Sequence, residues 1–76
     1  MSKLPLTTAK QLCKIIEKYG FYKIRQRGSH AFYSDGFGNS TVIPMHQGDL
    51  KRGLIRGVLN DTGLSIEEYE RLRNEV

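Results

Sequence analysis

Two histidines are the residues best suited to acid–base chemistry in this sequence of 76 residues. His30 follows Gly28-Ser29, and His46 follows later in the chain, after a proline and a methionine. Imidazole ordinarily titrates near pH 6.5, so both of its protonation states are present at neutral pH and it can move a proton. We therefore consider His30 and His46 first as candidates for catalysis.

His30 is the stronger candidate because cations precede it in a segment that we expect to be the neighbouring strand. These cations, which could hold phosphate, are Lys23, Arg25 and Arg27. Ser29 could orient the imidazole or an incoming phosphate, and Gly28 allows the backbone to turn sharply before it. RNA carries its own nucleophile, the 2′-hydroxyl, so one acid or base and a few cations would suffice to cleave it, whereas DNA would be spared. The alternative is an exposed histidine without a catalytic role.

The remaining reactive side chains give weaker predictions. His46 is a possible second acid or base, although a purely structural place in its loop is the simpler interpretation. Neither histidine has cysteines or carboxylates at ligand spacing, so we predict no metal site and no cofactor. Cys13 is the only cysteine, which excludes a disulfide framework and favours a reducing cytoplasm. We expect Cys13 to be a half-buried side chain beside the core rather than a nucleophile.

The charge is unevenly distributed along the chain. The whole sequence has a net charge of +4. Residues 1–56 contain ten Lys and Arg and three acidic residues, a net charge of +7, whereas residues 57–76 contain two and five, a net charge of −3. A basic body indicates an anionic partner, most often nucleic acid, although a basic solvated surface is also compatible with it.

The elements that must position these residues can be read from hydrophobic periodicity. Thr8 and Gln11 form a capping box. The apolar stripe that follows predicts a helix ending near Gly20, with Leu12, Ile15, Ile16 and Tyr19 inside. The pattern then alternates over Phe21–Gln26, which predicts a half-buried strand with Tyr22 and Ile24 inside and Lys23 and Arg25 outside. Strands at Ala31–Ser34 and Thr41–Ile43 follow, joined by a turn at Asp35–Asn39, where Phe37 could stack on a base or fold back over the core.

Two further helices are predicted after the strands. Asp49 is the expected N-cap of the first, whose apolar stripe contains Leu50, Leu54, Ile55, Val58 and Leu59. Lys51, Arg52 and Arg56 face outward, and Gly53 and Gly57 suggest close packing. Gly63 ends this helix, and Ser65 with Glu68 caps a last one, from Ile66 to about Asn74. Ile66, Tyr69 and Leu72 would dock it.

These elements predict one α+β domain over residues 1–76. Its order is α-β-β-β-α with a short extra C-terminal helix, and its three-stranded antiparallel sheet has the helices on one face. The other face of the sheet is then open to a ligand. No apolar run reaches membrane-spanning length, and no apolar stretch follows the first charge, so we expect neither a membrane span nor a signal peptide.

Four ordered motifs resemble the HicA toxin family of type II toxin–antitoxin systems. They are Gly20-Phe21 with Arg25-Gln26-Arg27-Gly28-Ser29-His30, then Val42-Ile43-Pro44-Met45-His46, then Asp49-Leu50-Lys51-Arg52-Gly53-Leu54-Ile55-Arg56, and Gly63-Leu64-Ser65. The resemblance extends from about Ala9 to Tyr69. It implies a double-stranded-RNA-binding-like fold and ribosome-independent cleavage of mRNA, with translation inhibited as a result. It also implies that His30 is catalytic and that a HicB antitoxin is the protein partner.

Two other functions remain compatible with the sequence. A non-catalytic RNA-binding module would use the same basic body, and double-stranded-RNA-binding domains carry basic residues at the start of their last helix, where Lys51 and Arg52 lie. A pure interaction domain would present the basic face to an acidic protein.

Overall fold

The first helix, α1 (Ala9–Lys18), begins as its sequence predicts. The structure, a computed structural model, describes residues 4–76. The Thr8 hydroxyl accepts from the Gln11 backbone, and the Gln11 side chain accepts from the Thr8 backbone, so the predicted capping box is confirmed. Leu12, Ile15 and Ile16 are fully buried. Tyr19, at the C-cap, is 41 % exposed and so less buried than predicted; its ring stacks on Phe21 and its hydroxyl donates to the Gly63 carbonyl.

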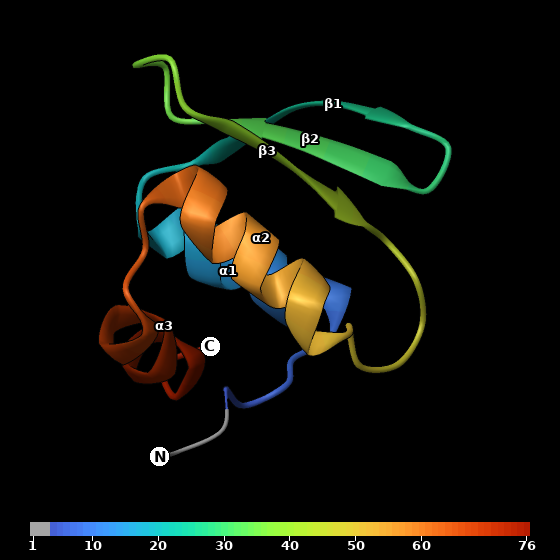
Figure 1. Ribbon diagram of the computed structural model, residues 1–76. Helices are drawn as coiled ribbons and strands as arrows, with labels where there is room; N and C mark the ends of the chain where they lie inside the picture. Colours follow the sequence, from blue (N-terminus) through green and yellow to red (C-terminus); the bar gives the residue numbers. More distant parts are fainter. Residues whose placement is uncertain (1–3) are drawn as a thin grey trace.

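The three predicted strands form one antiparallel sheet in the order β1-β2-β3. Strand β1 covers Tyr22–Arg27, β2 covers His30–Ser34 and β3 covers Ser40–Pro44. A two-residue turn, Gly28-Ser29, joins β1 to β2, and residues 35–39 join β2 to β3. Figure 1 shows α1 and α2 on the same side of this sheet, with the other side uncovered.

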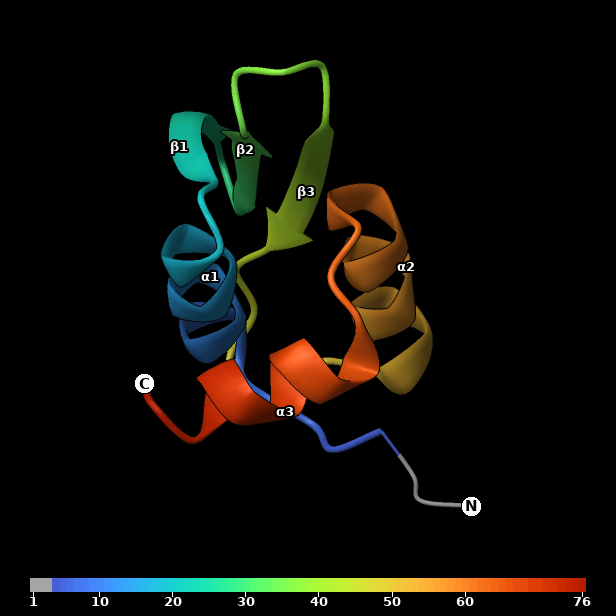
Figure 2. The same cartoon turned by 90° about the vertical axis from the view of Figure 1, so that its left-hand side faces the viewer.

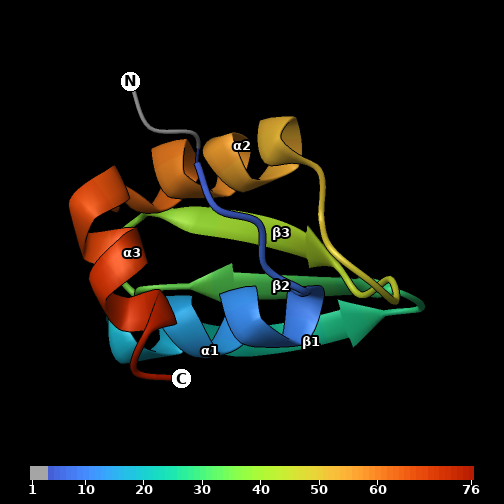
Figure 3. The ribbon, with the colours of Figure 1, turned by 90° about the horizontal axis from the view of Figure 1, so that it is seen from below.

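The two faces of the sheet differ in composition. Strands β2 and β3 turn alternate residues toward the helices, and these are buried: Ala31, Tyr33, Thr41 and Ile43. Their neighbours point to the opposite face, as the period of a strand requires. Figure 3 shows α1 and α2 lying side by side along the sheet, so the core is the space between these two layers.

Strand β1 is the exception, and its predicted burial pattern is wrong. All six of its residues are exposed, including Tyr22 at 53 % and Ile24 at 55 %. The pairing register shifts between Lys23 and Arg25, so Ile24 is an extra residue that reverses the alternation. β1 is also an edge strand. The bulge and the edge position together remove the predicted half-buried face.

Helix α2 (Arg52–Thr62) starts later than predicted. Lys51 is its N-cap and makes no side-chain capping bond, whereas Asp49, the expected N-cap, pairs with Thr8 in an isolated β-bridge. That bridge extends the backbone after Asp49 and delays the helix. The packing expected at Gly53 and Gly57 is also absent, since outside the adjoining residues and the backbone of the helix itself no described atom lies within 4 Å of a Cβ placed at either position.

Helix α3 (Ile66–Arg73) follows Gly63, which adopts the left-handed conformation that ends α2. The Ser65 hydroxyl caps α3 by accepting from the Glu68 backbone. Tyr69 and Leu72 are buried as predicted, but Ile66 is 42 % exposed because it lies on the first turn, away from the core. Figure 2 shows α3 crossing the ends of α1 and α2 on the side away from the sheet.

The N-terminal segment is held against this third helix. The Tyr69 hydroxyl donates to the Pro5 carbonyl at 2.6 Å, and the Arg73 guanidinium donates to the Leu6 carbonyl at 3.2 Å.

The order of the elements confirms the predicted α+β fold, with helices on one face of the sheet and a short additional C-terminal helix. No helix within residues 4–76 is both long and apolar enough to span a membrane.

Candidate functional site

The hairpin between β1 and β2 positions His30. His30 is the first residue of β2 and lies opposite Arg27 on β1 and Pro44 on β3. Gly28 has φ +58°, which a glycine adopts readily in the first position of a two-residue hairpin turn. The turn is fixed from both sides: the Gln26 amide donates to the Gly28 carbonyl at 3.1 Å, and the Met45 backbone donates to the Ser29 carbonyl.

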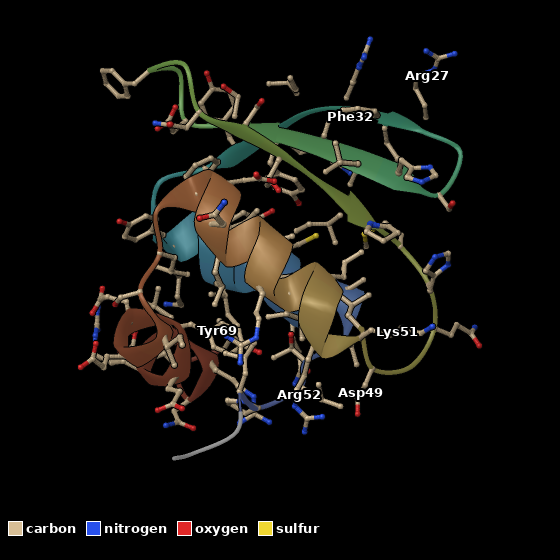
Figure 4. All side chains as sticks on the ribbon, in the orientation of Figure 1. Arg27, Phe32, Asp49, Lys51, Arg52 and Tyr69 are labelled. Carbon is tan, nitrogen blue, oxygen red and sulfur yellow. The ribbon has the colours of Figure 1, made fainter. Side chains whose placement is uncertain are left out.

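The register gathers two cations and an aromatic ring on the uncovered face with His30. Residues directly opposite each other in a sheet share a face, so Arg25 lies with Phe32 and Arg27 lies with His30. The Arg25 guanidinium carbon is 4.6 Å from the centre of the Phe32 ring, a cation–π contact. In Figure 4 the labelled Arg27 and Phe32 lie on the side of the sheet away from the helices.

The cations of this face are not neutralised by carboxylates. Within the described residues, the salt bridges join Lys18 to Glu75 and Arg71 to Glu68 and Glu75. Arg25 and Arg27 take part in none of them, and both side chains are exposed. The face around His30 therefore has a positive potential that favours an anionic ligand.

Lys23 does not join the other two cations of its strand. It lies opposite Tyr33, a residue of the covered face, and its ammonium donates to the Gln26 side chain at 3.1 Å. The bulge at Ile24 causes this separation, because it places Lys23 and Arg25 on opposite faces. Of the three cations predicted to hold phosphate, Arg25 and Arg27 therefore share the face of His30 and Lys23 does not, and the exposed Ser29 lies in the adjoining turn.

Lys51 and Arg52, the predicted cations of the second helix, lie in another region. In Figure 4 both are at the start of α2, apart from Arg27, which lies on the sheet. The Arg52 guanidinium donates to the Leu4 carbonyl at 3.0 Å, so this side chain has a structural partner. Lys51 is exposed at the N-cap.

His46 lies in the loop between β3 and α2, at the rim of a pocket of about 330 Å³. The pocket is also lined by Pro44, Asp49, Leu50, Lys51 and Leu54. Pro44 is the β3 neighbour of His30, so the pocket borders the His30 hairpin without containing His30. A larger hollow of about 550 Å³ between the end of α2 and the start of α3 has Arg56 as its only charged side chain and lies away from both histidines.

Two buried titratable side chains, Tyr33 and Cys13, lie between the sheet and the helices and not on the uncovered face. The Tyr33 hydroxyl donates to Glu17 at 2.9 Å, and burial followed by hydrogen bonds to Cys13 and Glu17 raises the pKa of Tyr33. Burial is also the main cause that raises the pKa of the Cys13 thiol, whose sulfur lies 3.7 Å from that of Met45. Cys13 is 6 % exposed, more buried than predicted, and unsuited to be a nucleophile.

The sequence interpretation missed one aromatic residue, Phe32, and left two alternatives open for another, Phe37. Phe32 belongs to the uncovered face, and the signal for this was the alternation of β2, in which Ala31 and Tyr33 are the buried pair. Phe37 is 89 % exposed, so the expectation that it folds back over the core is wrong. Its turn is closed by Asp35, whose carboxylate accepts from the backbones of Phe37 and Asn39 and from the Asn39 side chain, and these bonds lower the pKa of Asp35.

The site lies within a segment that matches a known family. A family model described as "HicA toxin of bacterial toxin-antitoxin" matches residues 9–64. The match includes α1, the whole sheet and α2, and it excludes α3. A search of curated proteins finds no match.

Proposed function

The chain belongs to the HicA toxin family of bacterial toxin–antitoxin systems, and from this premise we propose that it is an endoribonuclease that cleaves mRNA. The cleavage of mRNA would need no metal ion and no cofactor. A HicB-like antitoxin would neutralise it, and both would act in the cytoplasm, where mRNA is translated. The observation that carries the proposal is an exposed His30 beside two exposed arginines, Arg25 and Arg27, on one uncovered face.

The chemistry requires few protein groups. The 2′-oxygen of one nucleotide forms a bond to the adjacent phosphorus while the bond from phosphorus to the 5′-oxygen of the next nucleotide breaks. The 2′-hydroxyl loses a proton, the 5′-oxygen gains one, and the products end in a 2′,3′-cyclic phosphate and a 5′-hydroxyl. His30 would transfer one of these protons, and water or His46 would transfer the other.

The arginines would stabilise the charge that develops on the phosphate. Arg27 lies directly opposite His30, so a phosphodiester beside the imidazole would also be within reach of its guanidinium. Preorganised cations that face such a charge are a major source of rate acceleration. Ser29, one residue before His30, could donate a further hydrogen bond.

The test is the variant His30→Ala in a cleavage assay on purified protein and single-stranded RNA. We expect the cleavage rate to fall about 100- to 10,000-fold, the usual contribution of a general acid or base. Induced expression should then no longer arrest growth. Lys10→Ala, a substitution on the exposed face of α1, is the control and should cleave like the parent.

Because His30 is exposed, the free energy of unfolding of His30→Ala should lie within about 0.5 kcal/mol of the parent value. A folded His30→Ala protein that still cleaves RNA at the parent rate would refute the assignment. Cleavage should also persist in a chelator of divalent metals, and loss of cleavage there would refute the metal-independent mechanism.

A second candidate function is a non-catalytic RNA-binding module. The exposed Lys51 at the start of α2 favours it, because double-stranded-RNA-binding domains use basic residues at that place. Salt-dependent binding of RNA without cleavage at high protein concentration would support this function over the first.

A further inference from the structure

The uncovered face of the sheet has more apolar and aromatic surface than proton transfer requires. Tyr22 is 53 % exposed and Val42 is 38 % exposed, and Phe32 is half-buried beneath Arg25. Tyr22 lies opposite Ser34, so it shares the face of Phe32 and His30. A protein that only held phosphate would need cations here but no aromatic rings.

We propose that this face binds RNA as a single strand, with unpaired bases stacked on Tyr22 and Phe37 and with Arg25, held over the Phe32 ring, contacting a phosphate. This inference rests on the proposed function, since the strand would lead a phosphodiester to His30. Bases in a duplex stack on one another, so only single-stranded RNA can offer them to aromatic side chains.

The aromatic residues form a path away from His30. Phe32 follows His30 by two residues, an advance of about 6.6 Å along β2. Tyr22 lies beside the next outward residue, Ser34, and its hydroxyl would be 3.2 Å from a Cβ placed at Gly36, so its ring reaches the loop that contains Phe37. Figure 1 shows this loop extending beyond the strand ends on the side away from the helices.

Phe37 is presented by an ordered turn. Asp35 accepts hydrogen bonds from the Phe37 backbone at 2.8 Å and from the Asn39 backbone at 3.1 Å, and the Gly36 backbone donates to Ser34 at 3.0 Å. An exposed ring on a fixed backbone loses little entropy when it binds, which favours a role in recognition.

The positive charge of the uncovered face favours RNA as its ligand. Its charged side chains are Arg25 and Arg27, and among the residues that the register assigns to it within 4–76 there is no carboxylate. Asp35, in the loop that follows β2, has its carboxylate oxygens occupied by hydrogen bonds within the turn. Alternating cations and aromatic rings match the alternating phosphates and bases of a single strand.

The experiment measures the binding of fluorescently labelled 2′-O-methyl RNA, which cannot be cleaved through its 2′-oxygen. Phe37→Ala should weaken binding of the single strand about 5- to 100-fold, because one base loses its stacking partner. Phe37→Tyr should bind like the parent, whereas Phe37→Leu should behave like Phe37→Ala.

Arg25→Gln should weaken binding and reduce the slope of log affinity against log salt by about 0.7, the value for one phosphate contact on a single strand. Lys10→Gln, which removes the same charge from the exposed face of α1, should leave binding unchanged.

Two results would overturn the inference. One is parent-like binding of the single strand by Phe37→Ala and Arg25→Gln. The other is stronger binding of the duplex form of the same RNA that is lost in Lys51→Gln. Because the probe is not cleaved, a failure of the proposed catalysis would leave this measurement unaffected, and the two failures are distinguishable.

Discussion

The two faces of the sheet divide the work of this small domain. The covered face contains Ala31, Tyr33 and Ile43, each 3 % exposed or less, and together with the helices it forms the core. The uncovered face contains His30 and the Arg25–Phe32 pair, which contribute little to that core. Adjacent residues of one strand therefore serve different purposes, because the period of a strand sends them to opposite sides.

This division explains how 76 residues can combine a core with a site. Burial on one face stabilises the fold, so the other face can keep exposed arginines and aromatic rings without a structural role. It also predicts that stability and RNA binding can be altered independently, one face at a time.

The largest expected effect is on the covered face. Ile43→Ala should lower the free energy of unfolding by about 2–5 kcal/mol, because Ile43 is fully buried and its truncation leaves a cavity. Val42→Ala, one residue earlier on the uncovered face, should lower it by about 0.5 kcal/mol or less. Denaturant titration measures both, and equal losses would contradict the division between the faces.

An intermediate effect is expected at Gly28, in the hairpin turn between β1 and β2. Gly28→Ala should cost about 1–2 kcal/mol of unfolding free energy, since alanine is strained at φ +58° and no neighbouring atom lies within 4 Å to add a clash. Gly28→Asn should recover part of this loss, because asparagine tolerates that conformation better. Thermal unfolding of the two variants tests the order, and a parent-like alanine variant would show that the turn does not require glycine.

The smallest effect is expected at Tyr33. The pKa of Tyr33 is raised mainly by burial, so the folded state retains the phenolic proton that the unfolded chain releases above about pH 10. Stability should therefore be unaffected by this group below pH 10 and should fall as the pH rises further. Tyr33→Phe should cost about 1 kcal/mol at neutral pH through loss of the bond to Glu17.

Tyr33→Phe should also make the alkaline decline shallower. Part of the decline should remain, because burial raises the pKa of Cys13 and Tyr69 as well. Tyr22→Phe is the matched control on the uncovered face and should change neither quantity. An alkaline decline identical in the parent and Tyr33→Phe would contradict the assignment.

Periodicity predicted most of the fold. The capping box of α1, the three strands and the glycine that ends α2 all follow from local rules, and each is confirmed. The errors arise where tertiary contacts override these rules. Asp49 had the right type for an N-cap, but its backbone pairs with Thr8 and is not free to begin a helix.

The candidate site was less predictable than the fold. The alternation of β1 could not reveal a bulge, so the sequence grouped Lys23 with Arg25 although the bulge separates them. The Asp35–Asn39 turn was predicted, but the exposure of Phe37 on it was not, and neither was the hydrogen bond from Arg52 to the Leu4 carbonyl. The direction of one ring and a contact with a distant carbonyl depend on the tertiary structure.

The most direct measurement follows the backbone amides of labelled protein by NMR while non-cleavable, single-stranded 2′-O-methyl RNA is added. If the uncovered face binds RNA, the largest shifts will lie in residues 22–27 and 30–37, and the α1 amides will change little. If the largest shifts instead lie in residues 51–56 and on α1, and β1 and β2 are unaffected, this result would contradict the assignment of RNA binding to the uncovered face.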